Sequence, residues 1–312
     1  LTSVAFSMVI TASAVSGQTV EAAEVVVLDA TVIVGNSLYA DQVNALKTPT
    51  PIIDVPQSLS ITTADDISIR GFDSIGDIVD YTPGVSMSQG EGHRDAVVFR
   101  GVRSTADFFV DGVRDDVQYY RPLYNIEQVE ILRGPNALLF GRGGAGGILN
   151  RVTKKGVIGE NFNGYSTAIN TYGGAEVAVD SNVVINEDTA FRINAYYNTF
   201  KNHRDYSDGE GYGVNPTFKF QLAEKTTLDV SFEYIDYDRS IDRGIQTANG
   251  KTVDAHNDIV FGDSNLNKSD FETSAIRAMH QHDFSDSLKG LLIDPYTTSD
   301  KLLPTFHAEH NA

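Results

Sequence analysis

The second half of the chain alternates apolar and polar residues with a period of two. In TLDVSFEY, residues 227–234, apolar side chains occupy every second position, so a strand would carry them on one face and the polar ones on the other. FRINAYYN at 191–198 and YGVNPTFKFQL at 212–222 repeat the pattern. Segments of roughly ten residues with flanking aromatics are typical of a membrane β-barrel with an apolar exterior and a polar lumen. A soluble β-sandwich also alternates, but it buries its apolar face and its strands are shorter.

The connections between these segments differ in length. NEDT at 186–189 and AEKT at 223–226 are short turns, whereas residues 201–211 and 239–269 are long connections. Short turns at one end and long loops at the other are the pattern of an outer-membrane barrel. The sequence therefore favours antiparallel transmembrane strands and places both long loops outside the cell.

Residues 49–156 carry a mixed pattern instead. Two capping boxes, each a Ser or Thr followed three residues later by Asp, predict two short helices. The boxes are Thr63 with Asp66 and Ser74 with Asp77, and Pro83-Gly84 ends the second helix. AVVFRGV at 96–102, DFFVDGVRDDV at 107–117 and IEQVEIL at 126–132 read as strands, with Asp111-Gly112 as a hairpin turn. These residues are predicted to form a compact α+β domain.

A glycine cluster near residue 141 matches a nucleotide-binding spacing. Gly141, Gly143 and Gly146 fit G-x-G-x-x-G, which binds a dinucleotide only between a buried strand and a helix. Here a proline-started turn precedes the cluster, and the β-branched GILNRVTKK follows it. Glu160, at the distance of a ribose-binding acid, stands in a loop. The glycines therefore indicate tight turns and close packing, and a soluble nucleotide-dependent enzyme remains a remote alternative.

Composition narrows the function. The net charge of the 312 residues is -18, which disfavours a nucleic-acid partner because phosphate backbones are bound by Lys and Arg. The chain has no cysteine, so disulfides, thiolate metal sites and cysteine nucleophiles are excluded. No acid and base pair or metal-ligand set stands out, so we predict that the protein is not an enzyme and has no resident cofactor or metal.

The first 48 residues divide into two parts. Residues 1–17 form an apolar run with the small residues Ala12-Ser13-Ala14 where a peptidase would cut, and are interpreted as a signal-peptide remnant. The alternative is a helix or strand that opens a domain. Residues 18–48 read as a tether, whose β-branched stretch EVVVLDATVIVG either adds to another protein's sheet edge or pairs within its own domain.

Five blocks in order carry a family resemblance. They are DVPQSLSITTADDI, IGDIVDYTPGV, FRGV, FFVDGVRDD and NIEQVEILRGPNALLFGRGGAGGILNRVTKK. From about Val25 to about Ser287 the chain resembles the TonB-dependent outer-membrane receptors, in their ferric-siderophore branch. The resemblance implies an α+β plug domain at 49–156, followed at 157–290 by the first strands of an antiparallel transmembrane β-barrel. It also implies a place in the cell outer membrane, with outer-membrane lipid, a ferric siderophore and the TonB energy-transducing complex as partners.

The resemblance also assigns residues. The TonB box of the periplasmic tether is expected at Asp29, Ala30, Thr31, Val32, Ile33 and Val34, with Glu24 to Leu28 as a second candidate. Arg100 and Arg133 match positions that lock the plug to carboxylates on the barrel wall, here expected in later strands; a plug-internal ion pair is the alternative. From their chemistry, Arg94, Tyr119, Tyr120 and Arg121 on outward plug loops suit an anionic ferric chelate with aromatic or hydroxamate arms. The alternative is that they are solvated loop charges with a packing tyrosine.

The chain departs from the family at its end. Family barrels have about 22 strands, and about six are recognisable here. The alternation fades in residues 291–312, which carry two prolines and are interpreted as an aberrant tail. A truncated relic with a foldable plug is therefore an alternative to a working receptor. The cargo is open between a ferric siderophore, with catecholates slightly favoured by the resemblance, and haem, cobalamin or a sugar.

Overall fold

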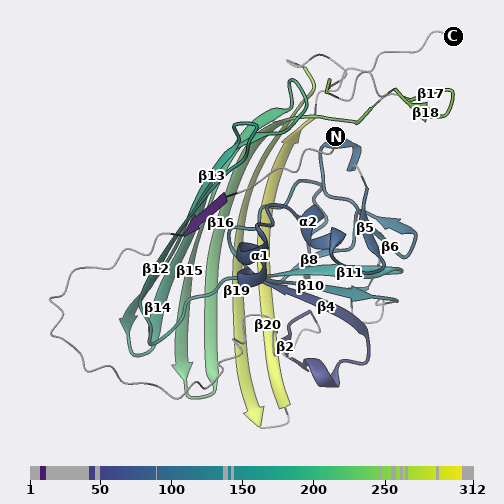
Figure 1. Cartoon of the computed structure of the whole chain (residues 1–312). Coiled ribbons are helices and arrows are strands. Elements are labelled where there is room, and N and C mark those ends of the chain that lie inside the picture. Colours follow the sequence, from purple (N-terminus) through teal and green to yellow (C-terminus); the bar gives the residue numbers. More distant parts are fainter. Residues whose placement is uncertain are drawn as a thin grey trace, which may run out of the picture.

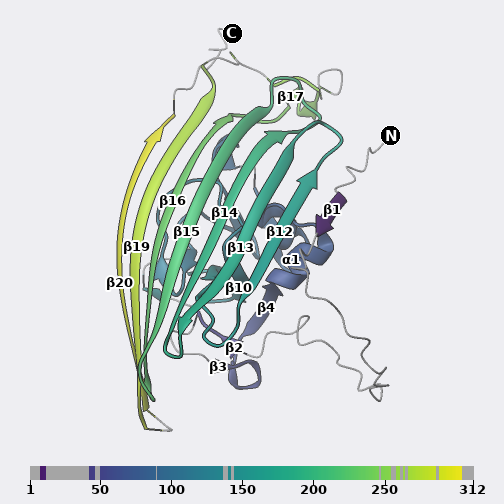
Figure 2. The same ribbon diagram turned by 90° about the vertical axis from the view of Figure 1, so that its left-hand side faces the viewer.

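The chain forms a curved wall of long strands with a smaller mixed domain, the plug, packed on its concave face (Figure 1; Figure 2). The computed structural model describes residues 8–11, 42–45, 50–88, 90–135, 140–141, 144–245, 247–253, 258–260, 263, 266–285 and 288–303. Among these residues no helix is long and apolar enough to cross a membrane.

The wall is one antiparallel sheet in the order β1-β12-β13-β14-β15-β16-β19-β20. Its strands are β1 (Met8–Thr11), β12 (Phe162–Ile169), β13 (Ala175–Asn186), β14 (Thr189–Lys201), β15 (Asp208–Ala223), β16 (Thr226–Ser240), β19 (Lys268–Ser285) and β20 (Leu288–Leu302). Within the described residues β1 and β20 are its two edges and do not pair, so the sheet is open.

The alternation read from the sequence sorts side chains between the two faces of the wall. In β15, Asn215 and Thr217 are buried toward the plug. The next residue, Phe218, is exposed on the outer face. In β16, Asp229 and Glu233 are likewise buried toward the plug. The predicted apolar exterior and polar interior are confirmed for these strands.

The predicted short turns are confirmed at residues 187–188 and 224–225. The connection expected at 201–211 is shorter, because β15 already begins at Asp208. The first part of β15 has glycine at every second position (Gly209, Gly211 and Gly213), so the apolar–polar alternation of a strand cannot be seen there in the sequence. A Cβ on Gly209 would lie 2.5 Å from the carbonyl oxygen of Asp238, so only glycine lets β16 approach this closely. The connection from β16 to β19 is long and contains the small hairpin β17 (Thr247–Ala248) and β18 (Lys251–Thr252).

The interpretation of residues 291–312 as an aberrant tail is wrong for residues 291–302, which belong to the strand Leu288–Leu302. These residues form β20, which pairs with β19 from Ser285↔Leu288 to Asp270↔Leu302. Proline removes a ladder donor and is tolerated on edge strands. Pro295 fits because β20 has a neighbour on one side only. Residues 304–312 lie outside the described residues.

Among its described residues, the plug contains two small sheets and the two helices α1 and α2. Its five-stranded sheet has the order β4-β10-β11-β8-β9, and a three-stranded sheet has the order β5-β6-β7. The strands are β4 (Ser58–Thr63), β5 (Val85–Met87), β6 (Val97–Phe99), β7 (Val102–Ser104), β8 (Phe108–Val110), β9 (Val113–Arg114), β10 (Ile126–Arg133) and β11 (Gly147–Thr153). The helices are α1 (Ala64–Arg70) and α2 (Ile75–Asp80), with 3-10 turns η2 (Ile52–Asp54) and η3 (Gly90–Gly92).

Local sequence signals explain most of these elements. Both predicted capping boxes are present, with Asp66 N donating to Thr63 Oγ1 at 3.1 Å and Asp77 N to Ser74 Oγ at 3.2 Å. The hairpin turn at Asp111-Gly112 is confirmed between β8 and β9. AVVFRGV, expected as one strand, is instead a second hairpin, because Arg100 (φ 47°) and Gly101 (φ 88°) are left-handed and turn the chain between β6 and β7.

The central plug sheet has an apolar core on each face. One core contains Ile78, Phe99, Phe108, Val129 and Ile131. The other contains Val43, Ala45, Phe109, Leu132, Phe140 and Ile148. Val43 belongs to β2 (Gln42–Val43), which pairs with β3 (Thr50–Pro51), so the end of the predicted tether packs onto the plug.

The structure describes only part of the chain start and of the glycine cluster, and it can be compared with the predictions there. Met8–Thr11 pairs with β12 as an edge strand, as in the alternative to a signal peptide, while residues 12–41 lie outside the described residues. The glycines were expected to mark tight turns and close packing. Gly146 and Gly147 do pack closely inside the plug, where an added Cβ would lie 2.8 Å from Phe99 Cβ and 2.6 Å from Leu132 O, respectively.

Candidate functional site: the interface between plug and wall

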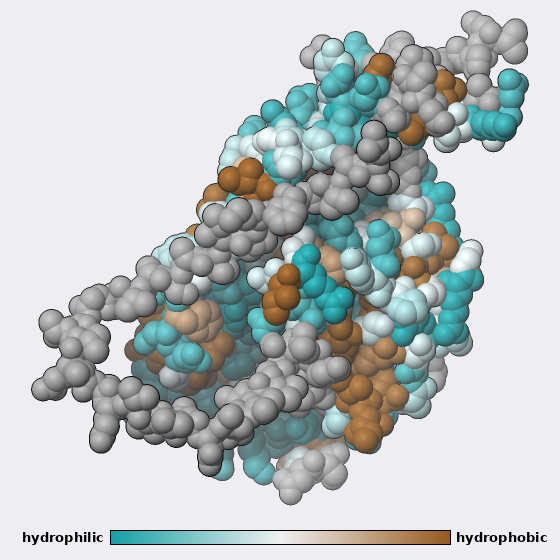
Figure 3. All heavy atoms as spheres, viewed as in Figure 1, coloured by the Kyte–Doolittle hydropathy of each residue, from teal (hydrophilic) through white to brown (hydrophobic). Residues whose placement is uncertain are grey.

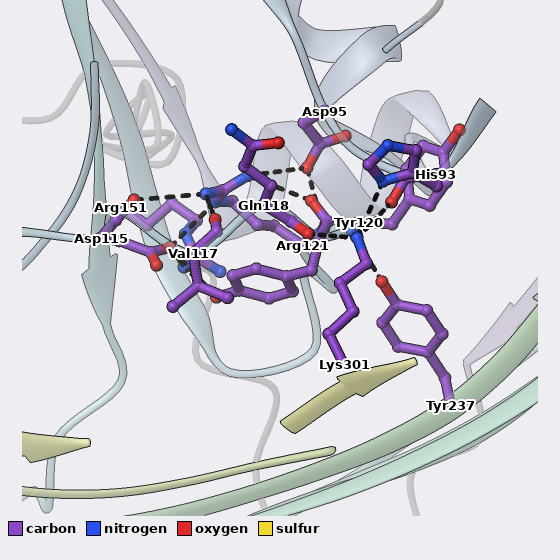
Figure 4. Close-up of polar contacts among 11 residues, drawn as sticks. His93, Asp95, Asp115, Val117, Gln118, Tyr120, Arg121, Arg151, Tyr237 and Lys301 are labelled. Carbon is purple, nitrogen blue, oxygen red and sulfur yellow. Dashed lines mark hydrogen bonds and ion pairs between the residues drawn. The ribbon is translucent and has the colours of Figure 1, made fainter. Parts of the chain in front are cut away.

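The predicted ligand residues lie where the plug meets the long-loop end of the wall. The ring of Tyr119 stacks on Phe271 of β19 with centroids 4.5 Å apart. The backbone N–H of Tyr120 donates to the hydroxyl of Tyr237 in β16 at 3.1 Å (Figure 4). Because Phe271 and Tyr237 stand near the ends of their strands that adjoin the 241–267 connection, this plug loop faces the end predicted to be outside.

A buried carboxylate organises the loop. Asp115 accepts from Arg121 Nε at 2.9 Å, from Arg151 Nη2 at 2.8 Å and from the Tyr119 hydroxyl at 3.1 Å. Both arginines are 3% exposed. Burial acts to raise the pKa of Asp115, but Arg121 and Arg151 outweigh it and hold that pKa below its usual range. Burial raises the pKa of Tyr119 to about 12, so its hydroxyl remains a donor.

Arg121 is used entirely within the fold. Its Nη2 donates to Val117 O at 2.7 Å and its Nη1 to Tyr119 O at 3.1 Å. Nη1 also lies 3.6 Å from Asp95 Oδ2, and the guanidinium sits 3.8 Å from the ring centroid of Phe108. Arg121 and Tyr119 therefore shape the loop from inside, and a direct contact of either with ligand stays a prediction.

Arg94 and Tyr120 are less buried than these two. Arg94 Nη2 pairs with Glu91 Oε1 at 3.0 Å, and its Nη1 donates to Gln118 Oε1. The Tyr120 ring lies beneath the Arg239 guanidinium at 4.1 Å. The guanidinium of Arg239 over the Tyr120 ring and that of Arg94 on a neighbouring loop therefore put two positive charges at this end of the interface.

Lys301 was not predicted to contribute to this site, because it lies in the segment 291–312 that was expected to be an aberrant tail. It projects from β20 and donates from Nζ to His93 Nδ1 at 2.8 Å, to His93 O at 3.1 Å and to Gln118 O (Figure 4). Burial, followed by Lys301 and Arg94, lowers the pKa of His93, so the neutral ring accepts this bond. The last described strand thus holds both predicted ligand loops.

A cavity of about 200 Å³ lies beside this cluster. The plug contributes Arg114, Asp115 and Tyr119, and the wall contributes Glu233, Arg277 and Thr297. Its lining combines both charges with hydroxyls. Such a cavity suits water and small polar groups between plug and wall.

Further toward the short turns, polar bonds join plug and wall. Asn125 of the plug donates to Glu233 Oε1 at 2.8 Å, and Glu233 also accepts from Arg277 at 2.8 Å. Lys154 pairs with Asp180 of β13 at 2.9 Å. Wall carboxylates therefore do hold the plug, through Asn125 and Lys154, neither of which was predicted to have this role.

Arg133, one of the two arginines predicted to lock the plug, binds within the plug. Arg133 donates to Ser58 Oγ and Ser60 Oγ, each at 2.9 Å, and to Pro83 O at 3.0 Å, all within the plug. Burial, followed by the charge of Arg100, lowers the pKa of Arg133. In the described part of the wall neither has a carboxylate partner, so their lock role stays a prediction. The predicted TonB box lies outside the described residues.

Comparisons with known proteins agree with this architecture. Residues 51–148 match the model of the TonB-dependent Receptor Plug Domain. The chain is 29% identical over 278 residues to the catecholate siderophore receptor Fiu of Escherichia coli, covering 80% of this chain and 36% of that protein. It is 27% identical over 265 residues to the probable TonB-dependent receptor BfrD of Bordetella pertussis, covering 81% and 36%. The chain thus spans little over a third of these relatives.

Solved structures show the same fold. The closed form of Fiu from E. coli superposes with a TM-score of 0.76 at 25% identity, over 85% of this chain and 40% of that one. The siderophore receptor PiuA from Acinetobacter baumannii gives a TM-score of 0.77 at 23% identity, over 85% and 40%.

Proposed function

Because the chain belongs to the TonB-dependent receptors in its plug and in the barrel strands that follow, we propose that it serves in the uptake of a ferric siderophore. Receptors of this family lie in the outer membrane, and so does this one. The observation that carries the proposal is a plug held against the concave polar face of a wall whose outer face is apolar. Figure 3 views the plug side, where hydrophilic and apolar residues intermingle.

The proposed work is binding and gated passage, with no covalent chemistry. The plug obstructs the lumen, the ferric siderophore binds at its long-loop end, and the TonB complex pulls on the tether at Asp29 to Val34. Energy comes from the proton gradient of the inner membrane. The polar plug–wall contacts suit this role, because exchangeable hydrogen bonds can be remade after the plug moves.

A catecholate chelate is our preferred cargo. Such chelates are anionic and aromatic, which suits guanidinium groups beside tyrosine rings. Arg94 and Tyr120 offer this pair at the long-loop end, with Arg239 above Tyr120. The likeness to the catecholate receptor Fiu supports the same preference.

Uptake of radiolabelled iron tests the proposal. Cells with the intact gene that contains this chain should take up ferric catecholate, and cells lacking it or lacking TonB should not. Arg94→Ala should lower uptake, while Lys225→Ala, in a short turn at the opposite end, should not. Iron uptake that is unchanged by deletion of the gene, for catecholate and hydroxamate chelates alike, would refute the siderophore proposal.

A further inference from the structure

The end of the tether is fastened to the plug by one carboxylate. Glu130 lies in the middle of β10, the strand between β4 and β11, and is 0% exposed. Its Oε1 accepts from Asn44 N at 2.6 Å and its Oε2 from Ala45 N at 2.6 Å. Two successive backbone amides that are 85 and 86 residues away in sequence are therefore held by a single side chain.

The acceptor capacity of Glu130 is otherwise filled by neutral amides. Gln128 Nε2 donates to Oε1 at 2.6 Å and Asn150 Nδ2 to Oε2 at 3.0 Å. Asn44 Nδ2 adds a bond to Oε1 at 3.3 Å. A buried carboxylate depends on such donors for its stability, so losing the two tether amides would leave the charge short of partners.

The same segment closes an apolar core. Val43 and Ala45, on either side of Asn44, are 0% exposed and pack with Phe109, Leu132 and Ile148. We define residues 42–45 as the strap. Lifting the strap uncovers the second face of the plug sheet as well as Glu130.

A polar path leads from the strap to the plug–wall interface. Asn150, bonded to Glu130 through Nδ2, accepts through Oδ1 from the N–H of Gly112 at 2.9 Å. Gly112 forms the turn before Val113 to Val117, which line the cavity beside the wall. Displacement of the strap from Glu130 would therefore disturb, through Asn150, a hairpin that lies at the interface.

We propose that Glu130 is the positioning residue that fastens the tether to the plug, so that tension on the tether reaches β10 and the 111–112 turn through the strap. The mechanical part rests on the proposed function. We call the bonds between Glu130 and the strap the latch. The latch does not rest on the proposed function, so the latch and the transport function can fail separately.

Amide hydrogen exchange on the full chain in detergent micelles tests the latch. In the wild type the amides of Asn44 and Ala45 should exchange at least ~100-fold slower than an unprotected amide, as buried amides bonded to a charged acceptor do. Exchange at the unprotected rate would overturn the proposal without any variant.

Glu130→Gln tests the carboxylate. Each carboxylate oxygen accepts from one backbone N–H of the strap, so whichever way the new side-chain amide is oriented, its NH₂ faces a strap N–H. Exchange at Asn44 and Ala45 should accelerate about tenfold or more, and exchange at Gly112 should accelerate with it. Ile53→Ala, at an exposed position on the connection that follows β3, is the control and should leave all three amides unchanged.

A measurement of force separates a latch from a general loss of stability. The chain is pulled from its N-terminus with the wall anchored. Glu130→Gln should lower the force of the first rupture and leave later ruptures, which report the remaining plug, in place. An unchanged first rupture, or an equal fall in all of them, would overturn the latch, whereas failed siderophore uptake would leave it intact.

Discussion

Replacing Asp115 by asparagine removes one carboxylate from between two buried guanidinium groups. Asn keeps the size of the side chain but puts a neutral amide against Arg121 and Arg151, which now contact Asp115 at 2.9 and 2.8 Å. Asp95, at 3.6 Å from Arg121, becomes the nearest remaining carboxylate. The variant therefore leaves Arg151 buried without its ion-pair partner.

The cost follows from that burial. Breaking a buried ion pair by removing one partner destabilises a protein by about 3–5 kcal/mol. Asp116 gives a matched control one residue away, because its side chain is 52% exposed and its pair with Arg114 is 3.5 Å long. An exposed pair contributes about 0–1 kcal/mol, so Asp116→Asn should change little.

Urea denaturation of the full chain in detergent micelles measures the difference. Near-ultraviolet circular dichroism of the tyrosines reports the interface, since Tyr119 stacks on Phe271. Asp115→Asn should lower the free energy of unfolding by about 3 kcal/mol or more. If both variants fell within ~0.5 kcal/mol of each other, the arginines would be solvated in the folded protein and the reasoning would be wrong.

The pH dependence gives a second check on Asp115. Its folded pKa lies below the ordinary value of 3.8, so its contribution is present above 3.8 and is lost as the pH falls through the folded pKa. The gap between wild type and Asp115→Asn should therefore be full at neutral pH and should narrow only below pH 3.8. A gap that closed between pH 5 and 7 would assign the effect to another group.

Three further predictions concern the tether, the plug core and the separate parts. A peptide from Glu24 to Gly35 should bind the periplasmic domain of the energy transducer by strand addition, and Val32→Pro, which removes a backbone donor, should abolish binding in a titration; undiminished binding would move the box to Glu24 to Leu28 or discard it. Gly146→Ala puts a Cβ 2.8 Å from Phe99 Cβ and should cost about 1–3 kcal/mol in thermal unfolding. Residues 49–156, expressed alone, should give a soluble monomer that unfolds cooperatively on heating. Residues 42–156 should have a free energy of unfolding about 2 kcal/mol higher, because they include Val43, which is then buried. Residues 164–312 should aggregate, and a soluble, cooperatively folded monomer would mean a sandwich core instead of a membrane wall.

The sequence by itself determined the elements whose signals are local. A capping box needs two residues three positions apart, and the turn at Asp111-Gly112 needs left-handed backbone at adjacent positions, so both could be predicted. The alternation in β14, β15 and β16 likewise depends only on successive residues. It sorted lumen-facing from outward-facing side chains correctly before any partner strand was known.

The tertiary structure decided which polar groups are buried and what satisfies them. IEQVEIL reads as an ordinary strand, and nothing local shows that Glu130 is fully buried, because its strap partners lie 85 and 86 residues away. The same holds for Asp115 with Arg151, and for Lys301 with His93. Pro295 made β20 look like an irregular tail, yet the open edge of the sheet accepts it. A residue's nearest neighbours in sequence fix its backbone preference, but the free energy of a buried charge depends on donors that only the folded chain brings within reach.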